Sequence, residues 1–130
     1  MKIDFEFDDE INKGLNHVID RFMEKGYTLH EGRVRVVLID PSKRMVIKIP
    51  LNMEGEIDNG REASHWKTNL KGDNFIPVAA CRLSEVMGYN LLIMQYIEEI
   101  PINELPEWAG YVDCSQVGKN RAGKFKAYDL

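Results

Sequence analysis

Lys48 is the residue whose type and setting most clearly suggest chemistry, because it is the one charge in the apolar run Met45-Val46-Ile47-Lys48-Ile49. A lysine amine can neutralise phosphate oxygens, but its flexible stem loses conformational entropy when it is fixed, so it needs an acid to hold it. Glu62, on the inner side of the helix expected next, can be that acid. An exposed pair contributes only about 0–1 kcal/mol, so it would serve to position Lys48. Taken singly, Lys48 also fits a solvated position on an edge strand, and Glu62 fits a solvated position on a helix.

A second candidate for chemistry is a hairpin close to the last residue. Residues 115–119 and 124–128 predict two strands joined by a turn at 120–123. Gln116 and Asp129 carry oxygens, the ligands that Mg²⁺ prefers, and the two ends of a hairpin lie side by side. These two residues could therefore share one metal ion. An ordinary hairpin that ends in an aspartate accounts for the same residues.

The elements that must position these residues begin with a helix and a hairpin. Apolar residues at helical spacing predict a helix over residues 9–25, which Asp8 or Asp9 can cap and Gly26 can end. Residues 33–39 and 44–49 predict two strands around the turn at 40–43. Period-two alternation separates two faces of the second strand, one with Met45, Ile47 and Ile49 and the other with Val46 and Lys48.

The rest of the chain completes an α+β pattern. The further elements that we expect are a loop at 51–58, a helix at 59–70, strands at 78–83 and 91–97, and a linker punctuated by Pro101 and Pro106. Strands with a helix between them and the hairpins predict an antiparallel sheet with packed helices.

The composition argues against several classes of function. The net charge is -4 and the pI about 5.4, whereas nucleic acids are bound by an excess of Lys and Arg, so we expect no nucleic-acid partner. No apolar run approaches the ~18 residues of a membrane span, and the acidic start lacks a signal-peptide profile. We therefore expect no membrane partner and a cytoplasmic location. Cys81 and Cys114 fit a reducing compartment, and a disulfide between them remains an alternative.

Four segments, taken in order, resemble the protein kinase family. Gly32-Arg33-Val34 resembles the end of the glycine-rich loop, and Val46-Ile47-Lys48 resembles the strand whose lysine pairs with a helix glutamate, here Glu62. The run from Leu91 to Glu98 resembles the fifth strand and the hinge. Gln116, Gly123 and Asp129 stand at the spacing of the metal-binding asparagine, a turn glycine and the aspartate of the Asp-Phe-Gly motif.

This resemblance, over residues 27–130, implies a kinase small lobe, a hinge and a metal-binding hairpin, with the large lobe truncated. A single kinase-like domain would comprise an acidic segment and helix (1–26), a small-lobe sheet and helix (27–98), and a linker with a hairpin (99–130). ATP and Mg²⁺ would be the cofactors, with the metal held by Gln116 and Asp129. Met94 would be the gatekeeper, and the backbone of Gln95 and Ile97 would face the adenine ring. The full implied nucleotide site is Gly32, Val34, Val46, Lys48, Glu62, Met94, Gln95 and Ile97.

Three departures from the family point to impaired catalysis. Tyr27 and Leu29 stand where two of the loop glycines belong, so close backbone approach to phosphate is lost. Tyr111 stands at the position of the catalytic aspartate, and a phenol does not act as a base at neutral pH. Asp113 is a substitute catalytic candidate, two residues away. The helices that would bind a protein substrate are also missing.

These features leave three hypotheses of function. The first is a catalytically impaired, kinase-like protein that acts by binding another protein, similar to bacteriophage accessory proteins that modulate a host protein in the host cytoplasm. The alternative is a minimal ATP- and Mg²⁺-dependent phosphotransferase. The third is an unrelated α+β binding domain. The sequence determines neither the partner nor the oligomeric state.

Overall fold

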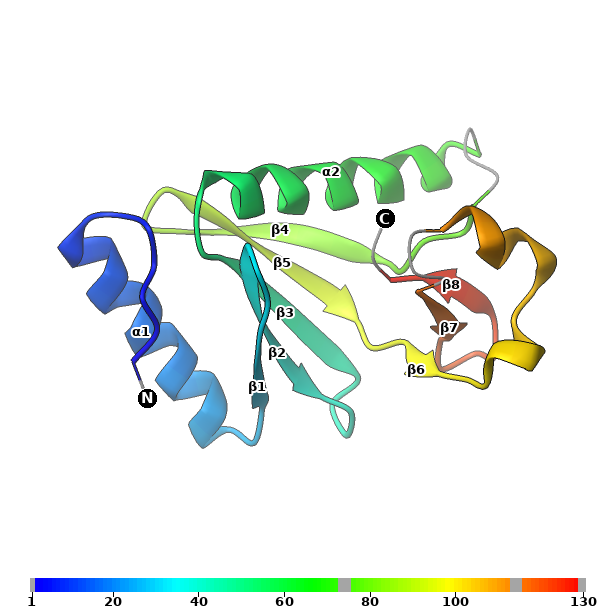
Figure 1. The fold of residues 1–130 in the computed structure, drawn as a ribbon, viewed down its shortest axis with the longest axis horizontal. Coiled ribbons are helices and arrows are strands. Elements are labelled where there is room, and N and C mark those ends of the chain that lie inside the picture. Colours follow the sequence, from blue (N-terminus) through cyan, green and yellow to red (C-terminus); the bar gives the residue numbers. More distant parts are fainter. Residues whose placement is uncertain (1, 73–75, 113–115, 129–130) are drawn as a thin grey trace.

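The computed structural model describes residues 2–72, 76–112 and 116–128, and it confirms an α+β architecture (Figure 1). One antiparallel sheet has five strands in the order β1-β2-β3-β5-β4, and a small sheet has three in the order β6-β7-β8. Figure 1 shows α1 at one end of the molecule, the small sheet at the other, and α2 running along β4 and β5. Within these ranges, no helix is long and apolar enough to cross a membrane.

The elements have the following bounds. The two α-helices are α1 (Asp9–Glu24) and α2 (Met53–Leu70), and two short 3-10 helices are η1 (Ile102–Glu104) and η2 (Glu107–Tyr111). The larger sheet contains β1 (Thr28–Glu31), β2 (Arg35–Asp40), β3 (Met45–Pro50), β4 (Cys81–Val86) and β5 (Tyr89–Gln95). The small sheet contains β6 (Glu98–Glu99), β7 (Val117–Lys119) and β8 (Phe125–Ala127).

α1 forms where the sequence predicts a helix. The Asp8 side chain accepts a hydrogen bond from Ile11 N at 3.0 Å, which satisfies one of the amides left free at the start of the helix. Leu15 and Ile19, one turn apart, are completely buried in the core of the larger sheet. Gly26 follows with φ 102°, a left-handed conformation that lets the chain turn into β1. α1 therefore packs against one face of the larger sheet.

The two faces of β3 have different surroundings, as the alternation predicts. Ile47 and Ile49 pack in the core that α1 covers. Val46 points to the opposite face, where it packs with Met94 of β5. Lys48 shares that face because side chains alternate along a strand. The charge predicted to do chemistry thus lies on the face opposite α1, where α2 packs on β3.

α2 begins earlier than the sequence suggests. The loop expected over residues 51–58 is wrong, because the helix starts at Met53. Asn52 caps it by accepting a hydrogen bond from Gly55 N at 3.0 Å. Gly55 lets the first turn lie against the chain that enters β2, since a Cβ there would stand 2.2 Å from Val34 O. The glycine that suggested a loop is a packing requirement of a helix.

The strands β4 and β5 are also shifted from their predicted positions. The sequence predicts strands at 78–83 and 91–97, whereas the paired strands share a tight turn at Met87 and Gly88. Both turn residues have left-handed backbone, with φ 53° and 87°. Two-residue turns of this kind match the twist of paired strands, so turn geometry sets the register.

The small sheet is attached to the larger one by close backbone contacts. β7 and β8 form the predicted hairpin, with shorter strands than expected. Gly118 in β7 lies so near β6 that a Cβ would stand 2.1 Å from Glu98 O. Ala127 N donates to Pro77 O, and Ala79 N donates to Ala127 O, both at 2.8 Å. The C-terminal hairpin is therefore hydrogen-bonded to the chain that enters β4.

The turn between β2 and β3 depends on Asp40. Its Oδ1 accepts hydrogen bonds from Ser42 Oγ at 2.6 Å and from Ser42 N at 3.1 Å, and its Oδ2 lies 3.3 Å from Lys43 Nζ. The Ser42 hydroxyl, and after it Lys43, hold the pKa of Asp40 below its usual value of 3.8. Because the ionised form is favoured in the fold, Asp40 stabilises the protein above its unfolded pKa. That contribution is lost as the pH falls through the folded pKa.

We expect Asp40→Asn to lower the urea midpoint of unfolding slightly at pH 7. The difference from the wild type should shrink below pH about 4, because both proteins then lack the charge. Ser42→Ala is the matched control and should lose only the hydroxyl part of the effect. A difference that is the same at pH 3 and pH 7 would show that the charge of Asp40 is irrelevant.

Candidate functional site

A buried ion pair joins β3 to α2. Lys48 Nζ lies 2.7 Å from Glu62 Oε1, and the side chains are only 6% and 7% exposed. The predicted pairing is present, but it is buried. Lys48 Nζ also donates to Tyr128 O at 2.9 Å, which brings the C-terminal hairpin onto the same amine. A buried charge is costly unless it is paired and hydrogen-bonded, so this lysine depends on Glu62.

Arg35 of β2 shares Glu62 with Lys48. Its Nη1 contacts Glu62 Oε2 and donates to Asn59 Oδ1 at 3.0 Å, and the side chain is buried. Two cations therefore surround one carboxylate. Sequence reasoning missed Arg35. The available signal was the alternation of β2, which puts Arg35 and Val37 on one face.

Asn59 holds this cluster of Arg35, Lys48, Asn59 and Glu62 together. Its side chain is completely buried, one turn before Glu62 on α2. Its Nδ2 donates to Lys48 O at 3.1 Å and to Asn90 O at 2.8 Å, while its Oδ1 accepts from Arg35. The amide therefore fixes α2 against β3 and β5. Sequence reasoning missed Asn59 too, since the predicted helix began at this residue instead of at Met53.

The cluster borders a groove of about 580 Å³, which we call the main groove. This volume lies within the roughly 300–1,000 Å³ typical of ligand sites. Apolar side chains of β2, β3 and β5 line it together with charged and polar ones. The lining residues are Thr28, His30, Arg35, Val37, Ile39, Pro41, Val46, Lys48, Met94, Tyr96, Ile97, Glu98, Glu99, Gln116 and Tyr128.

The structure brings most of the sequence-predicted site residues together. Val46, Lys48, Met94, Ile97 and Gln116 line the main groove, although they come from three separate parts of the chain. Glu62 of α2, a further predicted site residue, contacts the groove through its ion pair with Lys48. The elements that carry these side chains are β3, α2, β5 with the segment after it, and the residue before β7.

Three predicted residues lie elsewhere. Gly32 N donates to Arg35 O at 2.9 Å in the tight turn between β1 and β2, and Val34 O accepts from Leu51 N at 2.8 Å. Neither lines the main groove. Gln95, predicted to contribute its backbone, donates its N to Ala80 O at 2.9 Å, and its Oε1 accepts from Ala80 N at 3.0 Å.

The strand register explains why Gly32 and Val34 lie outside the main groove. Lys48 lies opposite Val37 in the β2–β3 pairing, five residues beyond Gly32. The β2 residues that line the main groove are therefore Arg35, Val37 and Ile39. Gly32 instead serves the turn, because a Cβ there would stand 2.8 Å from the Arg35 carbonyl oxygen.

The predicted base and one predicted metal ligand cannot be placed. Asp113 and Asp129 lie outside the described residues. Tyr111, which stands at the position expected for a catalytic aspartate, is 75% exposed. Among residues 2–72, 76–112 and 116–128, no group of three His, Cys, Asp or Glu side chains could hold a metal ion.

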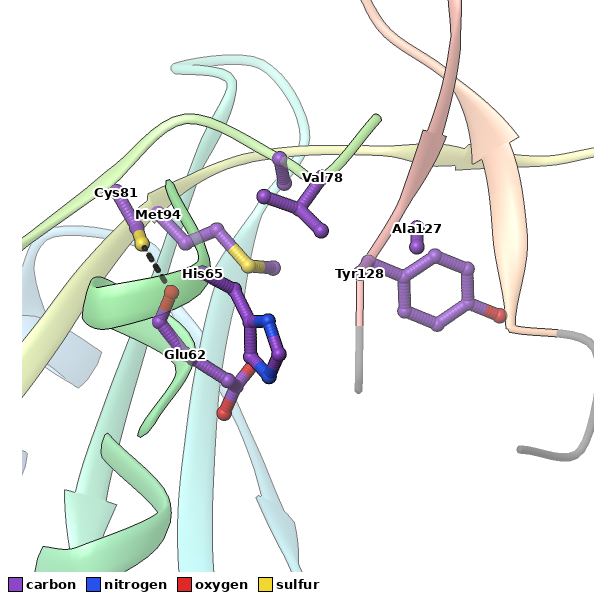
Figure 2. A pocket seen from close by; sticks show the side chains of 8 residues that line it. Glu62, His65, Val78, Cys81, Met94, Ala127 and Tyr128 are labelled. Carbon is purple, nitrogen blue, oxygen red and sulfur yellow. Dashed lines mark hydrogen bonds between the residues drawn. The ribbon is translucent and has the colours of Figure 1, made fainter. Parts of the chain in front are cut away.

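Met94 and Tyr128 also border a second, much smaller cavity of about 10 Å³ (Figure 2). A cavity of this volume holds about one water molecule at most. Cys81 lies on its wall and donates through Sγ to Glu62 O at 3.7 Å. Burial, with a smaller effect of the Glu62 charge, raises the pKa of Cys81 to about 11. This free thiol therefore stays protonated at neutral pH and is not a nucleophile.

No known protein family, curated protein sequence or solved structure matches this chain.

Proposed function

We propose that this chain is a kinase-like protein that binds ATP in the main groove, is impaired in catalysis and acts by binding another protein. The observation that carries nucleotide binding is the buried Lys48–Glu62 pair in the wall of a groove of ligand size. An amine held by a carboxylate suits the phosphates, and apolar walls suit a flat aromatic base.

The lining of the main groove supports both parts of this ligand. Val37, Val46, Met94 and Ile97 offer apolar surface for the base. Lys48, from the same strand as Val46, offers its amine two residues farther along. The arrangement of a lysine strand, a helix with its glutamate, and a strand leading into a hinge is the one that the kinase resemblance implies.

Two features support impaired catalysis. Tyr27 and Leu29, at the positions of two loop glycines, belong to the core: the Tyr27 ring meets Phe22 edge-on at 5.2 Å, and Leu29 packs against the cluster under α1. The β1–β2 turn therefore cannot wrap phosphates with its backbone. The exposed Tyr111 carries a phenol where the resemblance expects a catalytic carboxylate, and a phenol is not a general base at neutral pH.

Gln116 favours the alternative, a minimal ATP- and Mg²⁺-dependent phosphotransferase. Its amide is in the main groove with Lys48, and an amide oxygen is a suitable ligand for Mg²⁺. Together with Asp129, which the resemblance assigns as the second ligand, it would hold the metal that neutralises phosphate charge. Transfer of labelled phosphate that Gln116→Ala abolishes would favour this alternative over the impaired protein.

A bacteriophage origin and a host protein as the partner follow from the resemblance alone. They stay predictions, and affinity capture with the host proteome followed by reconstitution from purified proteins would test them.

Thermal melting with and without Mg-ATP tests nucleotide binding. At ten times its dissociation constant, ATP is expected to stabilise the fold by about 1.4 kcal/mol, which raises the melting temperature of a chain of this length by about 5 °C. Lys48→Met should remove the shift because the phosphates lose their cation. Val37→Phe should also remove it, because it fills the apolar part of the main groove and leaves the lysine in place.

The control is Lys67→Met, a lysine change on the exposed side of α2, which should keep the full shift. No shift in the wild type would overturn nucleotide binding. A shift that survives both Lys48→Met and Val37→Phe would place the nucleotide outside the main groove.

A further inference from the structure

We propose that a second groove, on the opposite face of the five-stranded sheet, docks an acidic peptide segment with apolar side chains. This inference rests on the proposed role as a protein-binding module, and it names the surface and the chemistry of the partner. The surface lies between α1 and strands β3, β5 and β4, and we call it the outer groove.

The outer groove has an apolar floor that α1 leaves incompletely covered. α1 packs mainly against β2, which lies toward the β1 edge of the sheet and away from β4. Phe22 of α1, Ile93 of β5 and Val86 of β4 line the outer groove and are only partly buried. Partly buried apolar side chains from three separate elements thus line one groove, which apolar side chains of a partner can fill.

The outer groove has a volume of about 260 Å³, less than half that of the main groove at about 580 Å³. A site of this volume accommodates a few side chains of a peptide.

The rim of the outer groove is basic. Arg21 and Lys25 of α1 line it and are exposed, and none of its lining residues is acidic. Arg82 of β4 is exposed on the same face of the sheet as Ser84, which lines the outer groove. These cations contrast with the net charge of -4 of the whole chain. Complementary charge speeds association and disfavours partners of like charge, so the rim selects an acidic segment.

A second copy of this chain is a poorer occupant. Its own acidic and apolar segment, residues 2–8, would have the right composition. However, Ile3 and Phe5 are buried in the core beside α1, and Asn16 Oδ1 accepts a hydrogen bond from Ile3 N at 2.6 Å. Docking that segment on a neighbour would give up this packing. A segment of another protein has no such cost.

A displayed library of random dodecapeptides, selected on the purified full chain, tests the proposal. We expect enriched peptides that combine Asp or Glu with large apolar residues. The double variant Arg21→Glu/Arg82→Glu should weaken their binding about tenfold or more, because it reverses the rim charge. Both changed side chains are exposed, so the variant should fold. Arg121→Glu/Lys124→Glu makes the same charge change on the β7–β8 turn and should leave binding unchanged.

The other outcomes overturn the proposal. Peptides that still bind the Arg21→Glu/Arg82→Glu variant would show a docking surface elsewhere, so the role in protein binding would stand while the outer groove would fall. Enrichment of basic peptides, or no enrichment, would refute the charge argument. A dimer that this variant dissociates would show a second copy as the occupant. None of these results bears on the thermal shift with Mg-ATP, which tests the main groove.

Discussion

Replacing Glu62 with glutamine is expected to lower the free energy of unfolding by about 3–5 kcal/mol, because Lys48 and Arg35 then stay buried without their shared carboxylate. Glutamine keeps the size of the side chain and one acceptor oxygen, so the loss reports on the charge. A typical domain has only about 5–15 kcal/mol of stability, so the effect is large. Equilibrium unfolding in urea measures it through the midpoint, with the slope as a check for two-state behaviour.

Two further variants make this result specific. Lys48→Met should cost less, about 1–2 kcal/mol, because Glu62 keeps Arg35 as its partner. Glu54→Gln makes the same chemical change in the exposed Arg33–Glu54 pair and should cost at most about 1 kcal/mol. If Glu62→Gln and Glu54→Gln destabilise the chain equally, the buried cluster does not hold the fold together.

Replacing Gly118 with alanine is expected to destabilise the chain by about 3 kcal/mol, the upper end of typical overpacking costs. The new Cβ would stand 2.1 Å from Glu98 O and 2.8 Å from the Ile97 side chain. The first of these is a backbone atom, so rotating a side chain cannot relieve the clash. β7 and β6 would have to separate, and Ile97 and Glu98 line the main groove. We therefore expect the shift with Mg-ATP to be lost as well.

Gly60→Ala is the matched control for this experiment. Gly60 lies inside α2, and a Cβ there meets nothing within 4 Å. Alanine costs less backbone entropy in a helix, so this variant should gain about 0.5–1 kcal/mol and keep the Mg-ATP shift. Thermal and urea unfolding of both variants give the comparison. A Gly118→Ala protein as stable as the wild type would show that β6 and β7 are not tightly packed.

Local sequence signals predicted the elements that have strong periodicity and clear ends. α1 lies within a residue of its predicted range because its apolar spacing, the cap at Asp8 and the turn at Gly26 all act over a few residues. The alternation of β3 likewise predicted which face carries Lys48. Turn chemistry at 40–43 predicted the β2–β3 hairpin, where Asp40 accepts hydrogen bonds from Ser42.

Boundaries failed where contacts between distant segments outweighed local preference. Gly55 suggested a loop, but it permits the first turn of α2 to lie against the backbone at Val34. Val78 was predicted to begin a strand, yet it forms an isolated parallel bridge with Ala127, about fifty residues later. Neither contact depends on the type or spacing of the neighbouring residues, so no local pattern could predict it.

Local patterns in the chain predict an α+β fold with an antiparallel sheet, a lysine inside an apolar strand, and a glutamate on the next helix that can pair with it. Contacts between distant segments add Arg35 and Asn59 to this pair, keep Gly32 and Val34 away from the main groove, and form the outer groove. Alternation and helical spacing give only the face of each side chain within its own element. Which faces meet depends on strand register and on how the helices pack, and these are set by contacts across the whole chain.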